Sequence, residues 1–405
     1  MRVAVIGAGM VGLSTAWHLV NHDVETVVFE QDDVASGSSW GNAGWLTPTI
    51  ATPLPEPSVL KYGLRALLSP SSPVYVPPTL DPRLFRFLLQ FARNCTQVQW
   101  ERAMSSLVPL NEGALDAFAE LDVPDLGVTT RPATPFLAAY RDEDAREVLV
   151  EEFRHIEKAG QPVEYELLSG DEAQAAEPAF SGAIGAAIRI HGQRFLNPAA
   201  FVRGLGEVVE RRGVQVRIQR PVHAIDDDRD GVRIAGEKFD AAVIASGARL
   251  TDLARAVGVK RLVQAGRGYS FTVATEHLPQ GPVYFPAERV ACTPVDGRLR
   301  LAGMMEFRPV DAPRDARRIA AIRKAAAPLL RGANLDDRQD EWVGSRPCTS
   351  DGLPLIGRSR NPHVYVAGGH GMWGMTLGPV TGKLIAQQIV TGRTPDALRA
   401  VDPLR

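Results

Sequence analysis

The 405-residue chain has few of the features that mark specialised protein classes. Its three cysteines, Cys95, Cys292 and Cys348, form no C-x-x-C pair and no Cys/His cluster with zinc spacing. We therefore expect neither disulfides nor a metal site, and a reducing, cytoplasmic setting fits this cysteine usage. The formal net charge is only −2 and the basic residues are dispersed, so nothing points to a nucleic-acid partner.

Long apolar runs and internal repeats are also missing. No segment approaches the roughly 18 apolar residues that a membrane-spanning helix needs. The chain enters its first expected strand at once, so we expect no signal peptide. Peripheral association with the inner face of a membrane stays open. The composition, 45% hydrophobic and 23% charged, is typical of a soluble globular enzyme, and the length suggests two domains or one nucleotide-binding domain with an inserted second domain.

The first 30 residues carry the strongest signal. An apolar strand over 3–6 runs into Gly7-Ala8-Gly9-Met10-Val11-Gly12, a helical segment follows, and a second strand over 26–29 ends at Glu30. In a G-x-G-x-x-G turn the first glycine allows the tight turn, the second lets a pyrophosphate approach, and the third lets the helix pack on the strand. The acid accepts hydrogen bonds from a ribose and disfavours NADP. We predict a dinucleotide-binding βαβ unit.

Segments typical of such a domain recur in the middle and at the end of the chain. A helix from Asn197-Pro198 to Arg212 stops at Gly213 and precedes a strand over 214–218. A buried strand follows over 239–248. Near the C-terminus, a strand over 364–367 leads through a glycine-rich loop into a helix that ends near residue 390.

The intervening segments have other patterns. Helical periodicity marks 83–122 and 146–159, and short alternating runs from 270 to 304 indicate antiparallel sheet. The proline-rich stretch 48–82 reads as an excursion that covers an active site. We predict an FAD-binding domain made of residues 1–82, 195–258 and 340–405, and a substrate-binding domain made of residues 83–194 and 259–339. This interruption favours FAD over NAD.

Several further motifs, in this order along nearly the whole chain, carry a family resemblance. They are Ser38-Ser39-Trp40-Gly41-Asn42-Ala43-Gly44, Gly268-Tyr269-Ser270, Gly303-Met304, Gly344-Ser345-Arg346-Pro347, Asp351-Gly352, and Gly369-His370-Gly371 followed by Gly374. With the first glycine motif and Glu30, they make the chain resemble the D-amino-acid oxidase superfamily of flavoproteins. Within that superfamily it is most similar to bacterial D-amino-acid dehydrogenases of the small-subunit type.

The resemblance implies an α/β fold: a Rossmann-like FAD-binding domain of the glutathione-reductase type with an inserted α+β, antiparallel-sheet substrate domain. It also implies hydride transfer from the Cα of an amino acid to flavin N5, after which the imine hydrolyses to a 2-oxo acid and ammonia. The electron acceptor would be O₂, a quinone or another carrier. Sarcosine-oxidase-like relatives bind FAD through a cysteine, but here Gly344 stands at that position and Cys348 is out of register. Noncovalent FAD is therefore expected.

Two residues are expected to act on the substrate. By resemblance, Arg346 binds the substrate carboxylate, which suits a planar, permanently charged guanidinium. The alternative is a structural arginine paired with Asp351. Tyr269 is expected to place its hydroxyl near the carboxylate or amine, although a buried structural tyrosine is an alternative and Tyr284 competes for the role.

The resemblance also assigns residues to FAD. Besides the first glycine motif and Glu30, they are Gln31, Ser38, Ser39, Asn42, Ala43, Gly44, Leu46, Val222, Ser246, Gly247, Gly369, His370, Gly371, Gly374, Met375 and Thr376. His370 is expected to offer backbone N–H groups, with a general-base role as the less favoured reading. The helix that begins near Gly371 would turn its positive end to the flavin and stabilise its reduced form.

The substrate class stays open at this point. Trp45, Met372 and Trp373 could form an aromatic box for an apolar or cyclic substrate, or they could serve packing alone. A secondary-amine oxidase acting on glycine, sarcosine or a (hydroxy)proline-like substrate is the main alternative. A flavin monooxygenase would need a second nucleotide site, for which no signature exists. A purely electron-carrying flavoprotein would have no use for Arg346.

Overall fold

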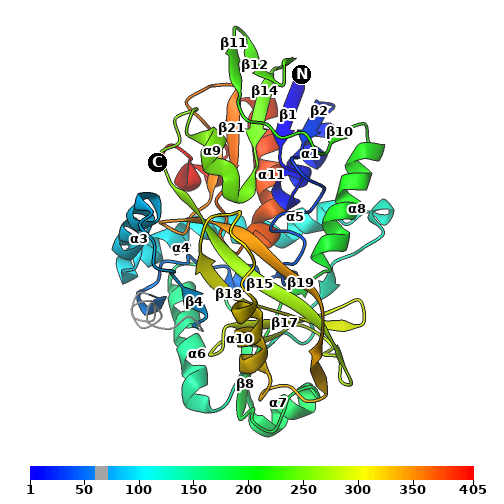
Figure 1. The fold of residues 1–405 in the computed structure, drawn as a ribbon, viewed down its shortest axis with the longest axis vertical. Coiled ribbons are helices and arrows are strands. Elements are labelled where there is room, and N and C mark those ends of the chain that lie inside the picture. The colour runs from blue at the N-terminus through cyan, green and yellow to red at the C-terminus, as the bar shows by residue number, and fades with distance from the viewer. Residues whose placement is uncertain (60–71) are drawn as a thin grey trace.

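The computed structural model describes residues 1–59 and 72–405. Figure 1 shows two sheets stacked end to end along the long axis, with both chain termini at the end that holds the smaller sheet. The smaller sheet has six strands in the order β10-β2-β1-β14-β21-β20 and is parallel except for the last pair. Its strands are β1 (Arg2–Ile6), β2 (Glu25–Phe29), β10 (Gln215–Arg217), β14 (Ala241–Ile244), β20 (Leu355–Arg358) and β21 (Val364–Gly368).

Both faces of this parallel sheet are covered, as parallel sheets require. Val3 and Val5 of β1 pack against α1 (Met10–Val20), α8 (Pro198–Arg211) and α11 (Gly374–Thr391), whereas Ala4 and Ile6 pack on the opposite side. That side holds α9 (Leu250–Ala254) and a meander of β11 (Asp226–Asp228), β12 (Gly231–Ile234) and β13 (Glu237–Phe239). The alternation follows from the two-residue period of a strand.

The expected helix ends are confirmed and one expected strand is shorter. Asn197 caps α8 by accepting a bond from the backbone N–H of Ala200, and Gly213 follows the helix in the left-handed region, φ +96°. The strand expected over 239–248 is limited to β14, because Phe239 belongs to the neighbouring meander and residues 247–249 turn into a 3₁₀ helix.

The larger sheet has nine strands in the order β19-β15-β18-β17-β16-β6-β8-β7, with β4 paired to β18. It confirms the antiparallel sheet expected over 270–304. One face is covered by α10 (Ala316–Ala326) and the other by α4 (Gln97–Glu112) and α6 (Glu143–Lys158). The strands are β4 (Val74–Tyr75), β6 (Leu137–Tyr140), β7 (Tyr165–Ser169), β8 (Ala186–Ile190), β15 (Val263–Thr275), β16 (Val283–Phe285), β17 (Val290–Val295), β18 (Arg298–Phe307) and β19 (Ala333–Thr349).

The predicted division into domains stays a prediction, and some of its boundaries do not follow the sheets. The boundary at residue 340 cuts through β19, which stays in the larger sheet to Thr349. The second half of the helical segment expected over 83–122 is split between α4 and α5 (Ala114–Leu121), and its Leu107 and Phe118 join the core formed by α1 and α11. Residues 97–121 therefore pack largely with the nucleotide-binding elements, whereas β4 pairs with the larger sheet.

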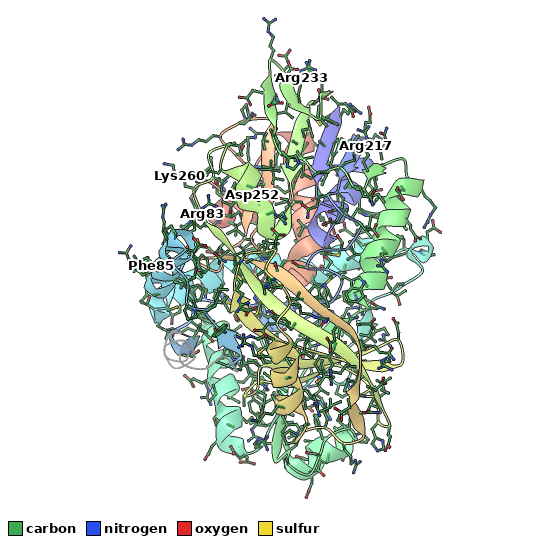
Figure 2. All side chains as sticks on the ribbon, viewed as in Figure 1. Arg83, Phe85, Arg217, Arg233, Asp252 and Lys260 are labelled. Carbon is green, nitrogen blue, oxygen red and sulfur yellow. The ribbon has the colours of Figure 1, made fainter. Side chains whose placement is uncertain are left out.

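The remaining elements are short, and the proline-rich stretch is described only in part. Pro70 lies outside the described residues; the described parts include a turn at Pro48–Ile50 and β4. A third small sheet joins β3 (Trp45–Leu46), β9 (Arg194–Phe195) and β5 (Arg131–Pro132). The other helices are α3 (Pro82–Asn94) and α7 (Gly170–Ala176). In Figure 2, Phe85 projects outward from α3, where it is 71% exposed. None of the described helices is long and apolar enough to span a bilayer.

Candidate active site

A cavity of about 1430 Å³ joins the two sheets. It begins at the carboxyl ends of β1, β2 and β14, where ligands bind in open parallel sheets, and it continues over one face of the larger sheet. Its walls include the glycine-rich turn after β1, the loop after Ser36, the start of α11 and the described proline-rich residues 52–59. The expectation that the proline-rich stretch covers the site is thus supported for its described part.

Steric limits explain why the first and the last position of the glycine motif must be glycine. Gly7 lies at φ +114°, and a Cβ there would be 2.5 Å from the Ala245 carbonyl oxygen. A Cβ on Gly12 would be 1.9 Å from the Gly7 oxygen, so Gly12 serves packing and does not line the cavity. At Gly9 the nearest atom would be Ser39 Oγ at 3.5 Å, which leaves the cavity side open to a ligand. Helix α1 starts at Met10, so its free N–H groups face this space.

The adenosine end carries an unsatisfied group. Glu30 lines the cavity while its carboxylate accepts bonds from the backbone N–H groups of Ala8 (2.8 Å) and Asp32 (3.0 Å). The buried Ser246 hydroxyl has no hydrogen-bond partner in the described part of the chain and lies against the same cavity. Gln31, Val222 and Gly247 line it as expected. A polar ligand such as a nucleotide would satisfy the orphaned hydroxyl.

The loop from Ser38 to Leu46, the flavin loop below, is fastened to the larger sheet and to α11. Four side chains donate to its carbonyl groups: Ser270 to Gly41 (2.8 Å), Arg300 to Asn42 (3.1 Å), Thr293 to Ala43 (2.7 Å) and Thr376 to Trp45 (3.1 Å). The Ser38 hydroxyl also donates to the Ser345 carbonyl. The loop therefore has a fixed position relative to both halves of the cavity.

Two expected FAD contacts of this loop need correction. Leu46 is fully buried in the core of α1 and α11 and does not line the cavity. Gly44 lies at φ +78°, where a Cβ would be 2.2 Å from the Leu196 oxygen, so it serves close packing. Ser38, Ser39, Asn42 and Ala43 do line the cavity. The resemblance identified the loop correctly, but it did not distinguish the residues that face the ligand from those that face the protein.

The start of α11 closes the opposite wall. His370 is 4% exposed and its Nε2 lies 2.9 Å from Thr381 Oγ1, while burial lowers its pKa to about 4. An imidazole with so low a pKa is a weak base, and its Nε2 is already bonded to Thr381, which supports the expectation that it is not the general base. Gly371, Gly374, Met375 and Thr376 line the cavity, so the positive end of the helix faces it. Gly369 instead packs on Thr349.

Arg346 lies on β19 and faces the cavity. Its Nη1 donates to the Met304 carbonyl at 2.6 Å, and among the described residues Nη2 and Nε have no acceptor. Burial lowers the pKa of its guanidinium, the Cys348 thiol opposes this shift, and no carboxylate of the described residues pairs with it. The alternative of a pair with Asp351 is wrong, because that carboxylate pairs with Arg405 and Arg261. A Cβ on Gly268 would be 2.3 Å from Arg346 Nη2, so this glycine makes room for the guanidinium.

The expected substrate role of Tyr269 is not supported. Tyr269 is among the residues that line the cavity, but its neighbour Gly268 is the residue beneath Arg346, and the Tyr269 ring packs in the core on the α10 side of the sheet. The Tyr269 hydroxyl donates to Glu306 at 2.6 Å, in a buried cluster with Arg267 and Arg318 beneath α10. The structural alternative therefore applies to Tyr269. Tyr284 of β16 also lines the cavity and lies beside Trp45, with ring centroids 5.4 Å apart.

The three residues of the proposed aromatic box all line the cavity and also pack. Trp45 Nε1 donates to Thr293 Oγ1 at 2.9 Å, and Trp373 Nε1 donates to the Thr52 carbonyl at 2.7 Å. Met372 packs beside the core of α3. The indoles are therefore held in place by their polar edges, and Trp45 and Tyr284 together form one aromatic wall.

Sequence reasoning missed several cavity residues. Trp342 lies between Gly41 and Gly344, since a Cβ on either glycine would fall within 2.2 Å of the indole. Glu56, Tyr140, Glu152 and Arg289 line the substrate side from four separate segments. Neither a motif nor a regular spacing marks them, because they meet only through the pairing of β6 with β16 and the packing of α6.

The cysteines do not approach the cofactor side. All three are among the described residues, all are buried, and none lines the cavity. Cys348 packs with Met305 and Phe307, and desolvation raises the pKa of its thiol to about 12. Because Trp342 fills the space beside Gly344, the position of the covalent cysteine in sarcosine-oxidase-like relatives has no room for a thiol here.

The geometry and the comparisons with known proteins agree on the class. Residues 2–388 match the family model of the FAD-dependent oxidoreductases, so the chain belongs to this family. It is 29% identical over 411 residues to a D-amino acid dehydrogenase of Cereibacter sphaeroides (strain ATCC 17029 / ATH 2.4.9), with 98% of this chain and 93% of that protein covered.

Solved structures share the fold over the whole length. Glycine oxidase from Geobacillus kaustophilus has a TM-score of 0.74 at 23% identity, covering 100% of this chain and 99% of its own. L-proline dehydrogenase from P. horikoshii has a TM-score of 0.71 at 17% identity, with 100% and 97% covered. The fold class expected from the sequence is confirmed, and the protein is an FAD-dependent oxidoreductase.

The hydrogen bonds that hold the flavin loop lead to a first prediction. Thr293→Val removes the acceptor of the Trp45 indole and the donor to the Ala43 carbonyl, each a loss of about 1–3 kcal/mol for a buried group. We expect FAD to bind about five- to a hundredfold more weakly, measured by fluorescence titration of the apoprotein. Thr275→Val is the control, because that hydroxyl bonds only within its own turn. Equal FAD affinity in both variants would show that the Thr293 hydrogen bonds do not hold the flavin loop for FAD binding.

The hydrogen bond between Tyr269 and Glu306 leads to a second prediction, which concerns stability. Tyr269→Phe removes the bond to Glu306 and should lower the free energy of unfolding by about 1–3 kcal/mol, measured by urea titration. The control Tyr165→Phe, at a half-buried ring without a hydroxyl partner among the described residues, should change it far less. Unchanged stability of Tyr269→Phe would sink the structural assignment.

Proposed function

We propose that the protein oxidises the Cα–N bond of a D-amino acid, with the resulting imine hydrolysing to a 2-oxo acid and ammonia. Family membership supports an FAD-dependent oxidation, and the similarity to a D-amino acid dehydrogenase supports the substrate class. The observation that carries the proposal is Arg346, a guanidinium that faces the cavity with no acid beside it.

A buried cation without a counter-ion is costly, and an entering anion would remove that cost. The guanidinium keeps its charge at any physiological pH and can bind a carboxylate through two parallel bonds. Because Nη1 is held by the Met304 carbonyl, Nη2 and Nε remain for the ligand. A purely electron-carrying flavoprotein would not need this group.

The cavity has room for the remaining parts of the reaction. When bound, FAD supplies the hydride acceptor at N5. The start of α11 directs its partial positive charge at the cofactor side, and Trp45 and Tyr284 shield the substrate side from water. Since His370 is neutral and bonded to Thr381, the substrate amine would lose its proton to solvent before reacting.

A secondary-amine oxidase is the second candidate, and the aromatic wall of Trp45 and Tyr284 favours it, because a flat wall suits a ring or an N-alkyl group. Both candidates use Arg346. They differ in whether the amine carries one carbon substituent or two, and a substrate panel separates them.

A third prediction tests Arg346. Arg346→Leu should weaken amino-acid binding by about 2–4 kcal/mol, at least thirtyfold, and Arg346→Lys should recover only part of this. Anaerobic bleaching of the flavin against D-alanine, D-proline, hydroxyprolines, glycine and sarcosine measures it. Arg338→Leu, at an exposed pair on the same strand, is the matched control and should behave as the wild type.

Bleaching by D-amino acids that is lost in Arg346→Leu would support the first candidate. Bleaching only by glycine, sarcosine or the proline compounds would move the protein to the second. Bound FAD that no amino acid bleaches would refute both.

For the electron acceptor, O₂, a quinone and another carrier were all open, and we propose a quinone at the cytoplasmic face of a membrane. Helix α3 exposes Phe85 and Leu89, with Arg83 and Arg86 on its outer surface, while its inner side lines the cavity through Leu88 and Phe91. Figure 2 shows Arg83 and Phe85 on the outside of this helix. An apolar and basic surface suits an anionic bilayer.

A fourth prediction follows. Reduced enzyme should be reoxidised faster by a soluble ubiquinone analogue than by air-saturated buffer, and it should sediment with vesicles containing 30% anionic lipid. Phe85→Ser with Leu89→Ser should reduce sedimentation at least about fivefold, because two apolar anchors are lost. Val148→Ser, at an exposed apolar residue on α6, is the control. Faster reoxidation by O₂, or vesicle binding unchanged in the double variant, would contradict this proposal.

A further inference from the structure

The substrate side of the cavity ends in a group of polar residues that are separate from Arg346, the residue proposed to bind the carboxylate. Glu56 lies in the described part of the proline-rich stretch, Tyr140 ends β6, Glu152 lies on α6, and Tyr284 and Arg289 flank the turn between β16 and β17. All five line the same cavity as Arg346. We call Glu56, Tyr140 and Glu152 the acidic wall.

The sheet fixes the separation between the two ends. Tyr284 pairs with Ala291, which pairs with Ala302 on β18, the strand whose Met304 carbonyl holds Arg346. Two strand spacings amount to about 10 Å. Ala291 and Ala302 line the cavity between them, so small side chains leave the floor open. An extended amino acid with its carboxylate on Arg346 would therefore direct the end of its side chain toward the acidic wall.

The two carboxylates of the wall are placed unfavourably as they stand. Desolvation, and then the neighbouring Glu56, raise the pKa of Glu152 to about 7, while Arg289 and a hydrogen bond from Thr52 oppose the shift. Neither Glu56 nor Glu152 forms an ion pair within residues 1–59 and 72–405. With two acids and one base, the group carries at most one excess negative charge, because the raised pKa leaves Glu152 partly protonated near neutral pH. A ligand with one positive charge would balance it.

Tyr140 gives an independent indication of a ligand. The residue is 4% exposed, and its hydroxyl has no hydrogen-bond partner among the described residues. Tyr140 lines the same cavity as Glu152, Tyr284 and Arg289. A buried hydroxyl without a partner costs about 1–3 kcal/mol, and a ligand donor or acceptor at this point would remove the cost. Trp45 and Tyr284 add ring faces that attract cations.

We propose that the acidic wall is a side-chain subsite that takes the ammonium or guanidinium of a basic amino acid, so that the preferred substrates are lysine- and arginine-like D-amino acids. This inference rests on the proposed function for the reaction itself, but the subsite makes its own binding prediction.

The first experiment compares pairs of amino acids that differ in whether the end of the side chain carries a positive charge. Anaerobic flavin reduction should be at least about tenfold more efficient, in rate over dissociation constant, with D-lysine than with D-norleucine, and with D-arginine than with D-citrulline. Glu152→Gln and Glu56→Gln should each reduce this preference about tenfold or more and leave D-norleucine nearly unchanged. Glu147→Gln, an exposed acid on the same helix outside the cavity, is the matched control.

The second experiment needs no oxidation. 6-Aminohexanoate and hexanoate share a carboxylate and differ by the terminal ammonium, and neither has an α-amine. Perturbation of the absorbance of the oxidised flavin should report at least about tenfold tighter binding of 6-aminohexanoate, lost in Glu152→Gln. Because this reading comes from the FAD-bound protein, retained flavin absorbance also shows that each variant is folded.

The outcomes separate the subsite from the reaction. Tighter binding of 6-aminohexanoate without flavin reduction by any amino acid would keep the subsite and refute the proposed function. Reduction by D-norleucine at least as efficient as by D-lysine would keep the function and overturn the subsite. A preference for hydroxyprolines over D-lysine would also overturn it, because a neutral donor would then be the ligand of the wall.

Discussion

The attachment of the flavin loop to the larger sheet is the constraint on which the site depends. The loop belongs by sequence to the nucleotide-binding end, yet Ser270, Thr293 and Arg300 of the larger sheet hold its carbonyl groups. Without these bonds the two halves of the cavity would be joined mainly by packing. With them, the distance between the cofactor side and Arg346 is set by backbone groups, which is what hydride transfer between two bound molecules requires.

The charges that line the cavity also differ between the cofactor side and the substrate side. At the cofactor side, the starts of α1 and α11 present partial positive charge, and at the substrate side Arg346 adds a full one. Acids line the cavity at the cofactor side too, among them Glu30, but Glu56 and Glu152 are the pair at the substrate side. An amino acid with a basic side chain matches this sequence of charges from its carboxylate to its far end. The subsite proposed here would thus orient such a ligand by electrostatics before any contact with a reacting atom.

Much of the fold could be predicted from the sequence because its signals are local. The glycine motif reports steric limits between Gly7, Gly12 and Ala245, and the end of α8 follows from a capping asparagine and a following glycine. The errors arose where strand registration or tertiary packing decides. A single step along β15 separates Gly268, which faces Arg346, from Tyr269, which faces Glu306. The substrate wall could not be found from spacing, because its residues come from distant segments.

The two ends of the cavity differ in how freely their residues can be substituted. The cofactor end is built from glycines whose neighbours leave no space for a Cβ, so few substitutions there are tolerated. The acidic wall comes from side chains on α6, β6 and the segment before residue 60, and none of them holds the flavin loop. Substitutions at the acidic wall can therefore change the preferred substrate while the residues at the cofactor end stay the same. One scaffold can thereby serve organisms that use different amino acids.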